Sequence, residues 1–342
     1  MTIVEALGAL VEGRDLSEEE AATVMRAIME GQGTPAQIGA LLAVLRAKHE
    51  TAEELTGLAR AMREKSVRVY PNRRPLIDTC GTGGDVLKTF NVSTTAAFVV
   101  AAGGVAVAKH GNRAATSKCG SADVLEALGV RLAIPPAQVA RCIDEVGIGF
   151  LFAPQHHPAM LYAAQPRKEL GFRTVFNVLG PLTNPAGATH QLIGVYHPDL
   201  ALLLARALAR LGCERAMVVH GMDGIDEVST IGATRICTVL NGAVDTETKV
   251  PEDFGLCRAE TVDLAGAQTP AGNAEMLLDV LSGAPGPRRD IVLLNSAAGL
   301  ILGGAACSWA DGLRAAAELI DTGRARRVLD ELVRFTAECD RQ

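Results

Sequence analysis

The alternation of short apolar runs with glycine-containing polar loops is the feature that most restricts how this sequence can fold. Residues 76–79 and 105–108 have the pattern of short strands, each is followed by such a loop, and helices are predicted at 93–102 and 121–128. Strands and helices that alternate at this spacing predict an α/β domain with a mostly parallel sheet. Because ligands bind at the carboxyl ends of the strands in such sheets, we look for a site in these loops first.

The same alternation continues downstream. Further strands are predicted at 149–152, 191–195, 217–219 and 291–294. Helical runs such as 200–211 lie between several of them. Residues 165–190 contain several Pro and Gly residues and predict a loop-rich crossing, whereas residues 240–290 have no pattern from which a structure can be assigned.

The start of the chain has a different pattern, without strands. Residues 17–20 (Ser-Glu-Glu-Glu) have the composition of a helix start, and apolar residues then recur at the spacing of one buried helical face. Two more helices are predicted to follow, before residues 71–75 (Pro-Asn-Arg-Arg-Pro) break the pattern as a linker does. We therefore expect a small all-helical domain at 1–70, joined in space by part of 165–190, and a larger α/β catalytic domain at 71–342.

Composition excludes several classes of protein. The 33 Lys and Arg residues and the 39 Asp and Glu residues give a net charge of −6, which provides no general attraction for nucleic acid. The eight Cys residues are scattered singly, so neither a zinc site nor a disulfide framework is expected. The longest apolar stretch, at 94–108, is about 15 residues long and too short to span a membrane. The acidic start of the chain also differs from a signal peptide, so we expect a cytoplasmic protein with no nucleic-acid or membrane partner.

The first candidate binding element is the glycine-rich loop at 80–85 (Cys-Gly-Thr-Gly-Gly-Asp). Its glycines let the backbone approach a ligand closely and direct several N–H groups at it, which suits a phosphate or pyrophosphate, although a tight turn without a ligand fits the same residues. Residues 89–94 (Thr-Phe-Asn-Val-Ser-Thr) then lead into a helix, where hydroxyls, free N–H groups and the helix dipole favour an anion. An ordinary helix cap is the alternative there. Two such elements so close together favour an anion site.

Charged side chains supply two further candidates. Residues 109–113 (Lys-His-Gly-Asn-Arg) also follow a strand, and their Lys and Arg suit a polyanion that is held from one side; an exposed basic turn is the alternative. Residues 223–229 contain the adjacent carboxylates of Asp226 and Glu227, which splay from a turn and suit a hard cation such as Mg²⁺. A solvated acidic turn fits the same pair.

Two other polar features are less specific. Arg167 has the chemistry to hold a carboxylate through two hydrogen bonds, whereas the other interpretation is a surface arginine. His156 and His157 are adjacent and are followed by Pro158, so we do not expect them to share a metal ion.

Taken together, these motifs resemble the anthranilate phosphoribosyltransferase family. The matching stretches are D-T-C-G-T-G-G-D at 78–85, F-N-V-S-T at 90–94, K-H-G-N-R at 109–113, G-S-A-D-V-L-E-A-L-G at 120–129, R-K-E-L-G-F-R-T-V-F-N-V-L-G-P-L-T-N-P at 167–185 and D-G-I-D-E-V-S at 223–229. Their order and spacing also agree with that family, over nearly the whole chain. Two alternatives share the architecture: a pyrimidine nucleoside phosphorylase, which has K-H-S at the position of 109–111 and no acidic pair, and a nucleic-acid-binding relative, which should have a basic surface.

The resemblance implies a fold of the nucleoside phosphorylase and phosphoribosyltransferase type, with a small helical domain hinged to a larger α/β domain, as a homodimer. It implies transfer of the phosphoribosyl group of phosphoribosyl pyrophosphate to the amine of anthranilate, a step of tryptophan biosynthesis. It also implies Mg²⁺, with two ions expected beside the substrate pyrophosphate. An aromatic amine needs little help from a general base, and His110 is a possible base.

The resemblance also implies the residues of the site. Those for phosphoribosyl pyrophosphate are Gly81, Gly84, Asp85, Thr89, Asn91, Val92, Ser93, Thr94, Lys109, His110, Gly111, Asn112, Arg113, Ala114, Ala115, Thr116, Ser117 and Ser121. Those for anthranilate are Gly81, Asn112 and Arg167, and those for Mg²⁺ are Ser93, Asp226 and Glu227. The expected catalytic residues are Lys109, Asn112 and Arg167. Thr116 and Cys119 stand where serine is more usual in the family, and Ala114-Ala115 makes this loop less polar.

Overall fold

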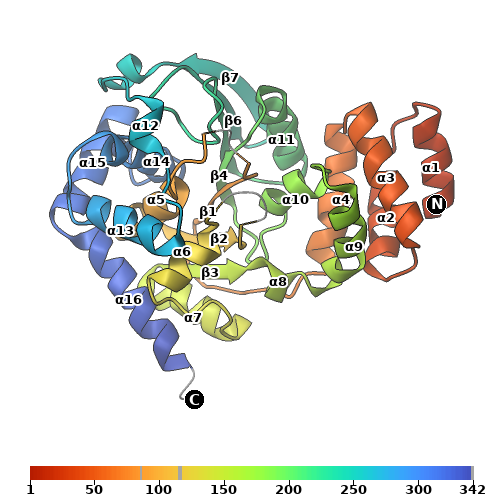
Figure 1. Cartoon of the computed structure of the whole chain (residues 1–342), viewed down its shortest axis with the longest axis horizontal. Helices are drawn as coiled ribbons and strands as arrows, with labels where there is room; N and C mark the ends of the chain where they lie inside the picture. The colour runs from red at the N-terminus through yellow and green to blue at the C-terminus, as the bar shows by residue number, and fades with distance from the viewer. Residues whose placement is uncertain (85–86, 115–117, 340–342) are drawn as a thin grey trace.

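The structure is a computed structural model that describes residues 1–84, 87–114 and 118–339 (Figure 1). Its N-terminal part consists of four helices: α1 Ile3–Val11, α2 Glu18–Met29, α3 Pro35–Lys48 and α4 Ala52–Glu64. Each begins with a capping box, in which a Thr or Ser hydroxyl and a Glu or Gln side chain satisfy backbone N–H groups of the first turn. The three predicted helices correspond to α2, α3 and α4, and α1 is an additional short helix.

The α/β part is built on a seven-stranded sheet with the order β3-β2-β1-β4-β5-β6-β7. The strands are β1 Leu76–Gly81, β2 Ala106–Gly111, β3 Ile148–Phe152, β4 His190–Gly194, β5 Arg215–Gly221, β6 Thr234–Leu240 and β7 Ala243–Lys249. Strands β1 to β5 pair in parallel, whereas β6 and β7 are added antiparallel. The predicted, mostly parallel sheet is therefore confirmed, and the segments that follow β1, β2 and β5 come together at one edge of it.

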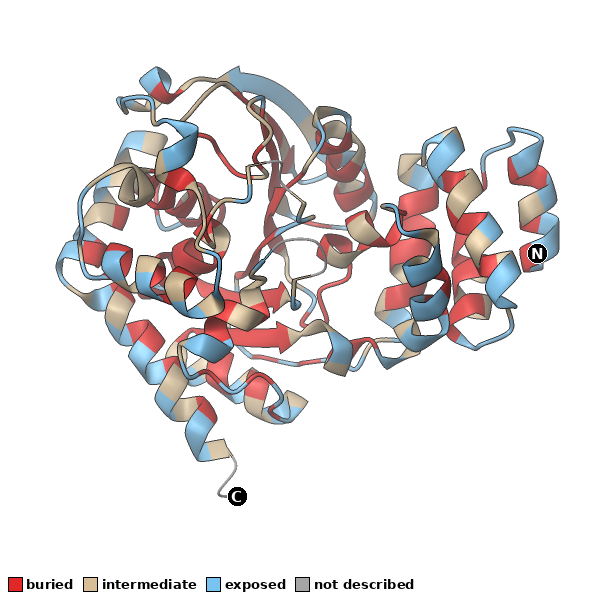
Figure 2. Ribbon diagram, viewed as in Figure 1, coloured by how far each residue is buried: buried red, intermediate tan, exposed pale blue. Residues whose placement is uncertain are grey.

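Helices cover both faces of the sheet. They are α5 Val92–Ala102, α6 Ser121–Ala127, α7 Pro136–Val146, α8 Ala153–His156, α9 Leu161–Leu170, α10 Phe176–Leu182, α11 Pro198–Arg210, α12 Thr261–Leu264, α13 Pro270–Leu281, α14 Pro287–Leu302, α15 Trp309–Asp321 and α16 Arg324–Glu338, with 3₁₀ turns at Pro158–Met160 and Pro251–Phe254. Helices α5 and α14 belong to one apolar core, and α11 belongs to a second core that continues through α10 into the N-terminal helices. Figure 2 shows the buried positions concentrated along the sheet and on the inward faces of these helices. None of the described helices is long and apolar enough to cross a membrane.

Two predictions about secondary structure are wrong. Residues 291–294, predicted as a strand, lie inside α14, which packs between α5, α15 and the sheet. A helix that is buried on all sides is apolar all round, and it loses the period that distinguishes it from a buried strand.

Residues 165–190 are not a loop-rich crossing, because they include most of α9 and all of α10. Pro166 and Pro181 lie inside these helices and are buried. A proline in a helix interior removes a hydrogen bond. Here the packing of α9 against α2 and α3, and of α10 against α4 and α11, compensates for that loss.

Candidate active site

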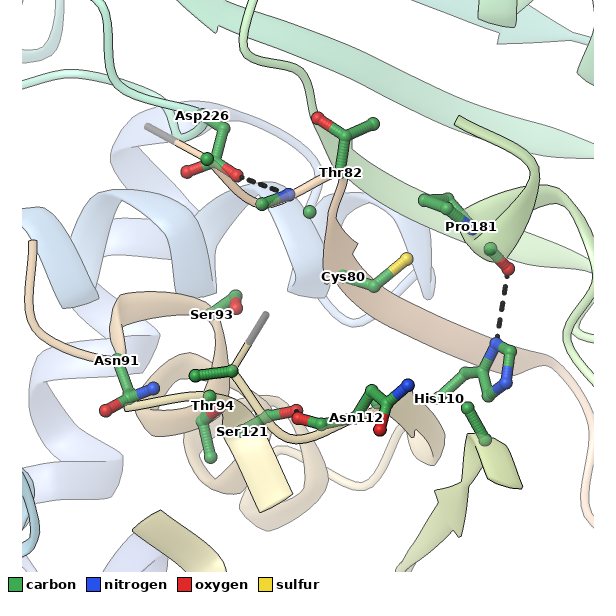
Figure 3. A pocket seen from close by; sticks show the side chains of 18 of the residues that line it. Cys80, Thr82, Asn91, Ser93, Thr94, His110, Asn112, Ser121, Pro181 and Asp226 are labelled. Carbon is green, nitrogen blue, oxygen red and sulfur yellow. Dashed lines mark hydrogen bonds between the residues drawn. The ribbon is translucent and has the colours of Figure 1, made fainter. Parts of the chain in front are cut away.

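A cavity of about 340 Å³ lies at the carboxyl ends of the central strands (Figure 3). It is lined by every described residue that the sequence assigned to a substrate or to the metal: Gly81, Gly84, Thr89, Asn91, Val92, Ser93, Thr94, Lys109, His110, Gly111, Asn112, Arg113, Ala114, Ser121, Arg167, Asp226 and Glu227. The other predicted residues, Asp85, Ala115, Thr116 and Ser117, lie outside the described residues. Motifs from distant parts of the chain therefore meet in one cavity.

The glycine loop after β1 fits closely against the segment that follows β5. The Gly83 N–H donates to Oδ2 of Asp226 at 3.2 Å, and a Cβ on Gly81 would lie 2.5 Å from the same oxygen. The Thr82 N–H donates to the Gly194 carbonyl at 2.8 Å, which ties the loop to the end of β4. A side chain at position 81 would therefore have to displace this carboxylate.

The helix that follows the glycine loop directs its N-terminus into the cavity. Asn91 stands at the cap position of α5 but makes no capping hydrogen bond with its side chain, and its Nδ2 donates instead to the Cys119 carbonyl at 3.4 Å. The Oδ1 atom of Asn91 is buried, with no hydrogen-bond partner among the described residues. An N-terminus left in this state favours an anion, because its N–H groups and the helix dipole both attract negative charge.

The two adjacent carboxylates reach different elements, as expected for side chains that splay from a turn. Asp226 accepts from the glycine loop, whereas Oε1 of Glu227 accepts from the Ser93 N–H on α5 at 3.1 Å. Figure 3 shows Asp226 and Ser93 on facing sides of the cavity. No group of three His, Cys, Asp or Glu side chains in the described ranges has metal-ligand geometry. Two carboxylates and a hydroxyl nevertheless fit Mg²⁺, which binds through one or two carboxylates and takes its other ligands from substrate phosphates and water.

Lys109 was expected in a loop after a strand, but the structure places it within a strand. It lies in β2, which pairs with β3 as far as Gly111, and its side chain is only 2% exposed. Its Nζ donates to the Thr79 carbonyl at 2.5 Å, beneath the glycine loop. Burial lowers the pKa of Lys109, and the carboxylates of Asp78 and Glu227 act in the opposite direction.

Asp78, a buried residue of β1, supports the cavity from below and was not among the predicted site residues. Its Oδ1 accepts from the His110 N–H at 3.1 Å, and its Oδ2 accepts from Nδ2 of Asn184 at 2.8 Å. Burial raises the pKa of Asp78 to about 6. The signal was available in the sequence, because Asp78 and Asn184 belong to two of the stretches that carry the family resemblance.

His110 is buried beside His156 and His157. Its Nδ1 donates to the Gly180 carbonyl at 3.2 Å, and its Nε2 is buried without a partner among the described residues. Burial, and then the two neighbouring histidines, lowers the pKa of His110 to about 3. A neutral imidazole with so low a pKa is a weak base at neutral pH, which disfavours the role of general base.

The loop after β2 is held by α6. Oδ2 of Asp123 accepts from the N–H groups of Ala114 and Gly120 at 2.9 and 2.8 Å. Arg113 forms two hydrogen bonds with Glu126, at 2.7 and 2.9 Å, and one with Asp123 at 3.2 Å. The positive charge of Arg113, predicted to face a polyanion, is therefore balanced by carboxylates of α6 in this structure.

The segment from α9 to α10 supplies a further wall. Arg167 lies 5.0 Å from the centre of the Phe176 ring, and burial lowers its pKa. The cavity is also lined by residues that were not predicted: Thr82, Arg173, Phe176, Asn177, Gly180 and Pro181. Most of them follow Arg167 in the matching stretch 167–185, which is the signal that could have identified them.

The fold and the site together define a class of protein. Residues 4–66 match the helical bundle domain, and residues 73–326 the a/b domain, of a glycosyl transferase family. The chain is 53% identical to the anthranilate phosphoribosyltransferase of Acetivibrio thermocellus over 97% of this chain and 96% of that protein. It is 55% identical to that of Moorella thermoacetica over 95% of each. The chain belongs to the anthranilate phosphoribosyltransferase family, as the sequence motifs indicated.

Solved structures support the same family assignment. The crystal structure of anthranilate phosphoribosyltransferase from Thermus thermophilus superposes with a TM-score of 0.91, at 45% identity, over 97% of this chain and 99% of that one. The enzyme from Saccharomyces cerevisiae, in complex with PRPP and Mg, superposes with a TM-score of 0.89, at 31% identity, over 98% of each chain.

Proposed function

We propose that this chain uses the cavity to transfer the phosphoribosyl group of phosphoribosyl pyrophosphate to the amine of anthranilate, with Mg²⁺ and with release of pyrophosphate. The observation that carries the proposal is the meeting of the glycine loop, the N-terminus of α5, the Asp226–Glu227 pair and Arg167 in one cavity. Two relatives support it. The yeast enzyme has been solved with PRPP and Mg, and also in complex with 4-fluoroanthranilate.

The proposed site for phosphoribosyl pyrophosphate lies between the loops after β1 and β2. The N-terminus of α5 attracts the anion through its helix dipole. The N–H groups of Gly83 and Ser93 donate to Asp226 and Glu227 in this structure, so they hold these carboxylates beside the proposed anion site. The remaining residues that we assign to this substrate are those named above as implied by the resemblance, from Gly81 to Ser121. Lys109 supplies positive charge from below the glycine loop, where little water screens it.

Ser93, Asp226 and Glu227 are the proposed residues for Mg²⁺, and we propose two ions. When bound, Mg²⁺ neutralises the charge that develops on the leaving pyrophosphate. Glu227 already contacts the backbone of Ser93, so it joins the ion site to the N-terminus of α5.

Arg167 is the proposed partner of the anthranilate carboxylate, with Asn112 and Gly81 beside the ring. The neutral amine attacks the anomeric carbon, the new C–N bond forms as the C–O bond to pyrophosphate breaks, and the electron pair leaves with pyrophosphate. The nitrogen, positively charged once the C–N bond has formed, then releases a proton to water. Because the attacking aromatic amine carries no proton that must be removed first, the weakly basic His110 is no obstacle to this mechanism.

The domain division at 1–70 and 71–342, the homodimer and the cytoplasmic location also remain predictions. The packing of α9 against α2 and α3 supports the idea that part of 165–190 joins the helical domain.

The test uses the fluorescence of anthranilate. We expect the signal to decay when purified protein, anthranilate, phosphoribosyl pyrophosphate and Mg²⁺ are all present, and to stay constant when any one is omitted. A folded protein that gives no decay would refute the proposal. Phosphorolysis of thymidine or uridine, or a gel shift with nucleic acid at physiological salt, would then identify one of the two alternatives.

A further inference from the structure

Arg173 contacts the glycine loop from a remote part of the chain. It lies between α9, which packs against the N-terminal helices, and α10. Its Nη2 donates to the Gly84 carbonyl at 2.6 Å, across 89 positions in the sequence. The side chain is half-buried and lines the cavity.

Tyr196, which follows β4, supports this contact from behind. The guanidinium carbon of Arg173 lies 4.1 Å from the centre of the Tyr196 ring, a distance at which the planar cation stacks on the aromatic face. The backbone N–H of Tyr196 donates to Oγ1 of Thr82 at 3.2 Å. One residue therefore supports both the arginine and the loop that the arginine holds.

The conformation of Gly84 is matched to Arg173. Its φ of +84° is one that other residues rarely adopt, and a Cβ added there would overlap Nη2 of Arg173. On the neighbouring residue, the Gly83 N–H is fixed by Asp226 at 3.2 Å. Two successive residues of the loop are thus held from two sides, by an arginine and by a carboxylate.

We propose that Arg173 is a positioning residue for the proposed reaction, which sets the shape of the glycine loop through Gly84 and thereby acts on the binding of phosphoribosyl pyrophosphate. The inference rests on the proposed function of the cavity. A loop held in its binding shape before the substrate arrives does not lose conformational freedom on binding, so releasing it weakens affinity. Arg167 and Arg173 lie on the same short segment, so this segment contributes to both substrate sites.

The first test compares Arg173→Ala and Arg173→Lys with Lys168→Ala, a change of an exposed cation on the same segment. We expect Arg173→Ala to raise the KM for phosphoribosyl pyrophosphate by about tenfold to a hundredfold, the range for loss of a hydrogen bond to a charged group. The KM for anthranilate and the melting temperature should change little. Arg173→Lys should recover part of the loss, since lysine can donate one hydrogen bond but cannot stack as a plane. Lys168→Ala should resemble the wild type.

The second test is a double-mutant cycle with Gly84→Ala. In the wild-type background, Gly84→Ala causes backbone strain and a clash of the new Cβ with the Arg173 guanidinium. In the Arg173→Ala background, only the backbone strain remains. We therefore expect Gly84→Ala to raise the KM for phosphoribosyl pyrophosphate by a smaller factor in the Arg173→Ala background.

Two results would overturn the inference while the wild type is active. One is a double-mutant cycle in which Gly84→Ala raises the KM for phosphoribosyl pyrophosphate by the same factor with and without Arg173→Ala. The other is an Arg173→Ala variant whose KM for phosphoribosyl pyrophosphate is unchanged. An inactive wild-type protein would instead count against the proposed function.

Discussion

The loops after β1 and β2 face the same cavity but are held in different ways. The loop after β2 is held by the helix that follows it, because Asp123 accepts from two of its backbone N–H groups. The loop after β1 is held by Asp226 and Arg173, which are 143 and 89 positions away from their partners. One wall of the site is therefore shaped by near neighbours in sequence, and the other is shaped only when distant segments pack together.

The two loops also differ in their charge. The β1 loop borders the Asp226–Glu227 pair, whose carboxylates face the cavity and suit a cation. In the β2 loop, Arg113 is already paired with α6. This difference indicates that removing charge on the β1 side lowers the rate of the reaction directly. Removing charge on the β2 side weakens the loop and acts on substrate binding only through the loop.

The largest effect is expected on the β1 side. Asp226→Asn with Glu227→Gln should lower kcat/KM by about a hundredfold or more at limiting Mg²⁺, a loss of about 3 kcal/mol of transition-state stabilisation. Steady-state kinetics over a range of Mg²⁺ concentrations would measure it. A control that removes the same charge from the exposed strand β7, Asp245→Asn with Glu247→Gln, should leave the rate unchanged. Near-normal activity of the first double variant would refute the metal role.

A second prediction concerns how the stability of the folded protein depends on pH. Burial lowers the pKa of His156, and it lowers that of His157 to about 4 and that of His110, on β2, to about 3, from 6.5. The unfolded chain therefore binds protons below pH 6.5 that the folded chain does not. Each such histidine removes up to about 1.4 kcal/mol of stability per pH unit as the pH falls from 6.5 toward its folded pKa. Asp78, on β1, acts in the opposite direction, because its raised pKa means that its contribution to stability increases as the pH falls from about 6 to 3.8.

Urea unfolding between pH 7.5 and 5 would test this prediction. His156→Gln keeps a donor for the Val67 carbonyl, which His156 Nδ1 contacts at 2.8 Å, but it does not titrate. We expect the loss of stability with acid to be smaller in this variant, because the lowered pKa of His156 no longer contributes to it. An identical slope would show that His156 does not have a lowered pKa in solution.

A smaller effect is expected from the β2 loop. Asp123→Ala removes the acceptor of two backbone N–H groups, so the KM for phosphoribosyl pyrophosphate should rise by about tenfold, with a loss of stability of about 1 to 2 kcal/mol. Glu126→Ala breaks only the exposed ion pair with Arg113 and should cost less than about 1 kcal/mol. Kinetics and thermal unfolding of both variants measure the difference. If Glu126→Ala proves as damaging as Asp123→Ala, local hydrogen bonding is not what holds this loop.

Much of the fold follows from patterns between near neighbours. The starts of α2, α3 and α4, the strand–loop–helix units around β1 and β2 and many residues of the cavity were predicted from the sequence, whereas cavity residues such as Thr82 and Arg173 were not. The errors occurred where burial removes the pattern. The interior of α14 lacks an exposed face, and α9 and α10 contain prolines that would end an isolated helix.

The sequence by itself determined many of the chemical groups that line the cavity, because glycines, hydroxyls and carboxylates are recognised from their own local motifs. Only the tertiary structure decided how they are held. Lys109 lies beneath the glycine loop because β2 pairs with β3 beyond its predicted end, and Gly84 meets Arg173 because α9 packs on the N-terminal helices. The physical reason is that a carbonyl or a buried charge can be satisfied by any suitable partner. Which partner it finds depends on the packing of segments far apart in the chain.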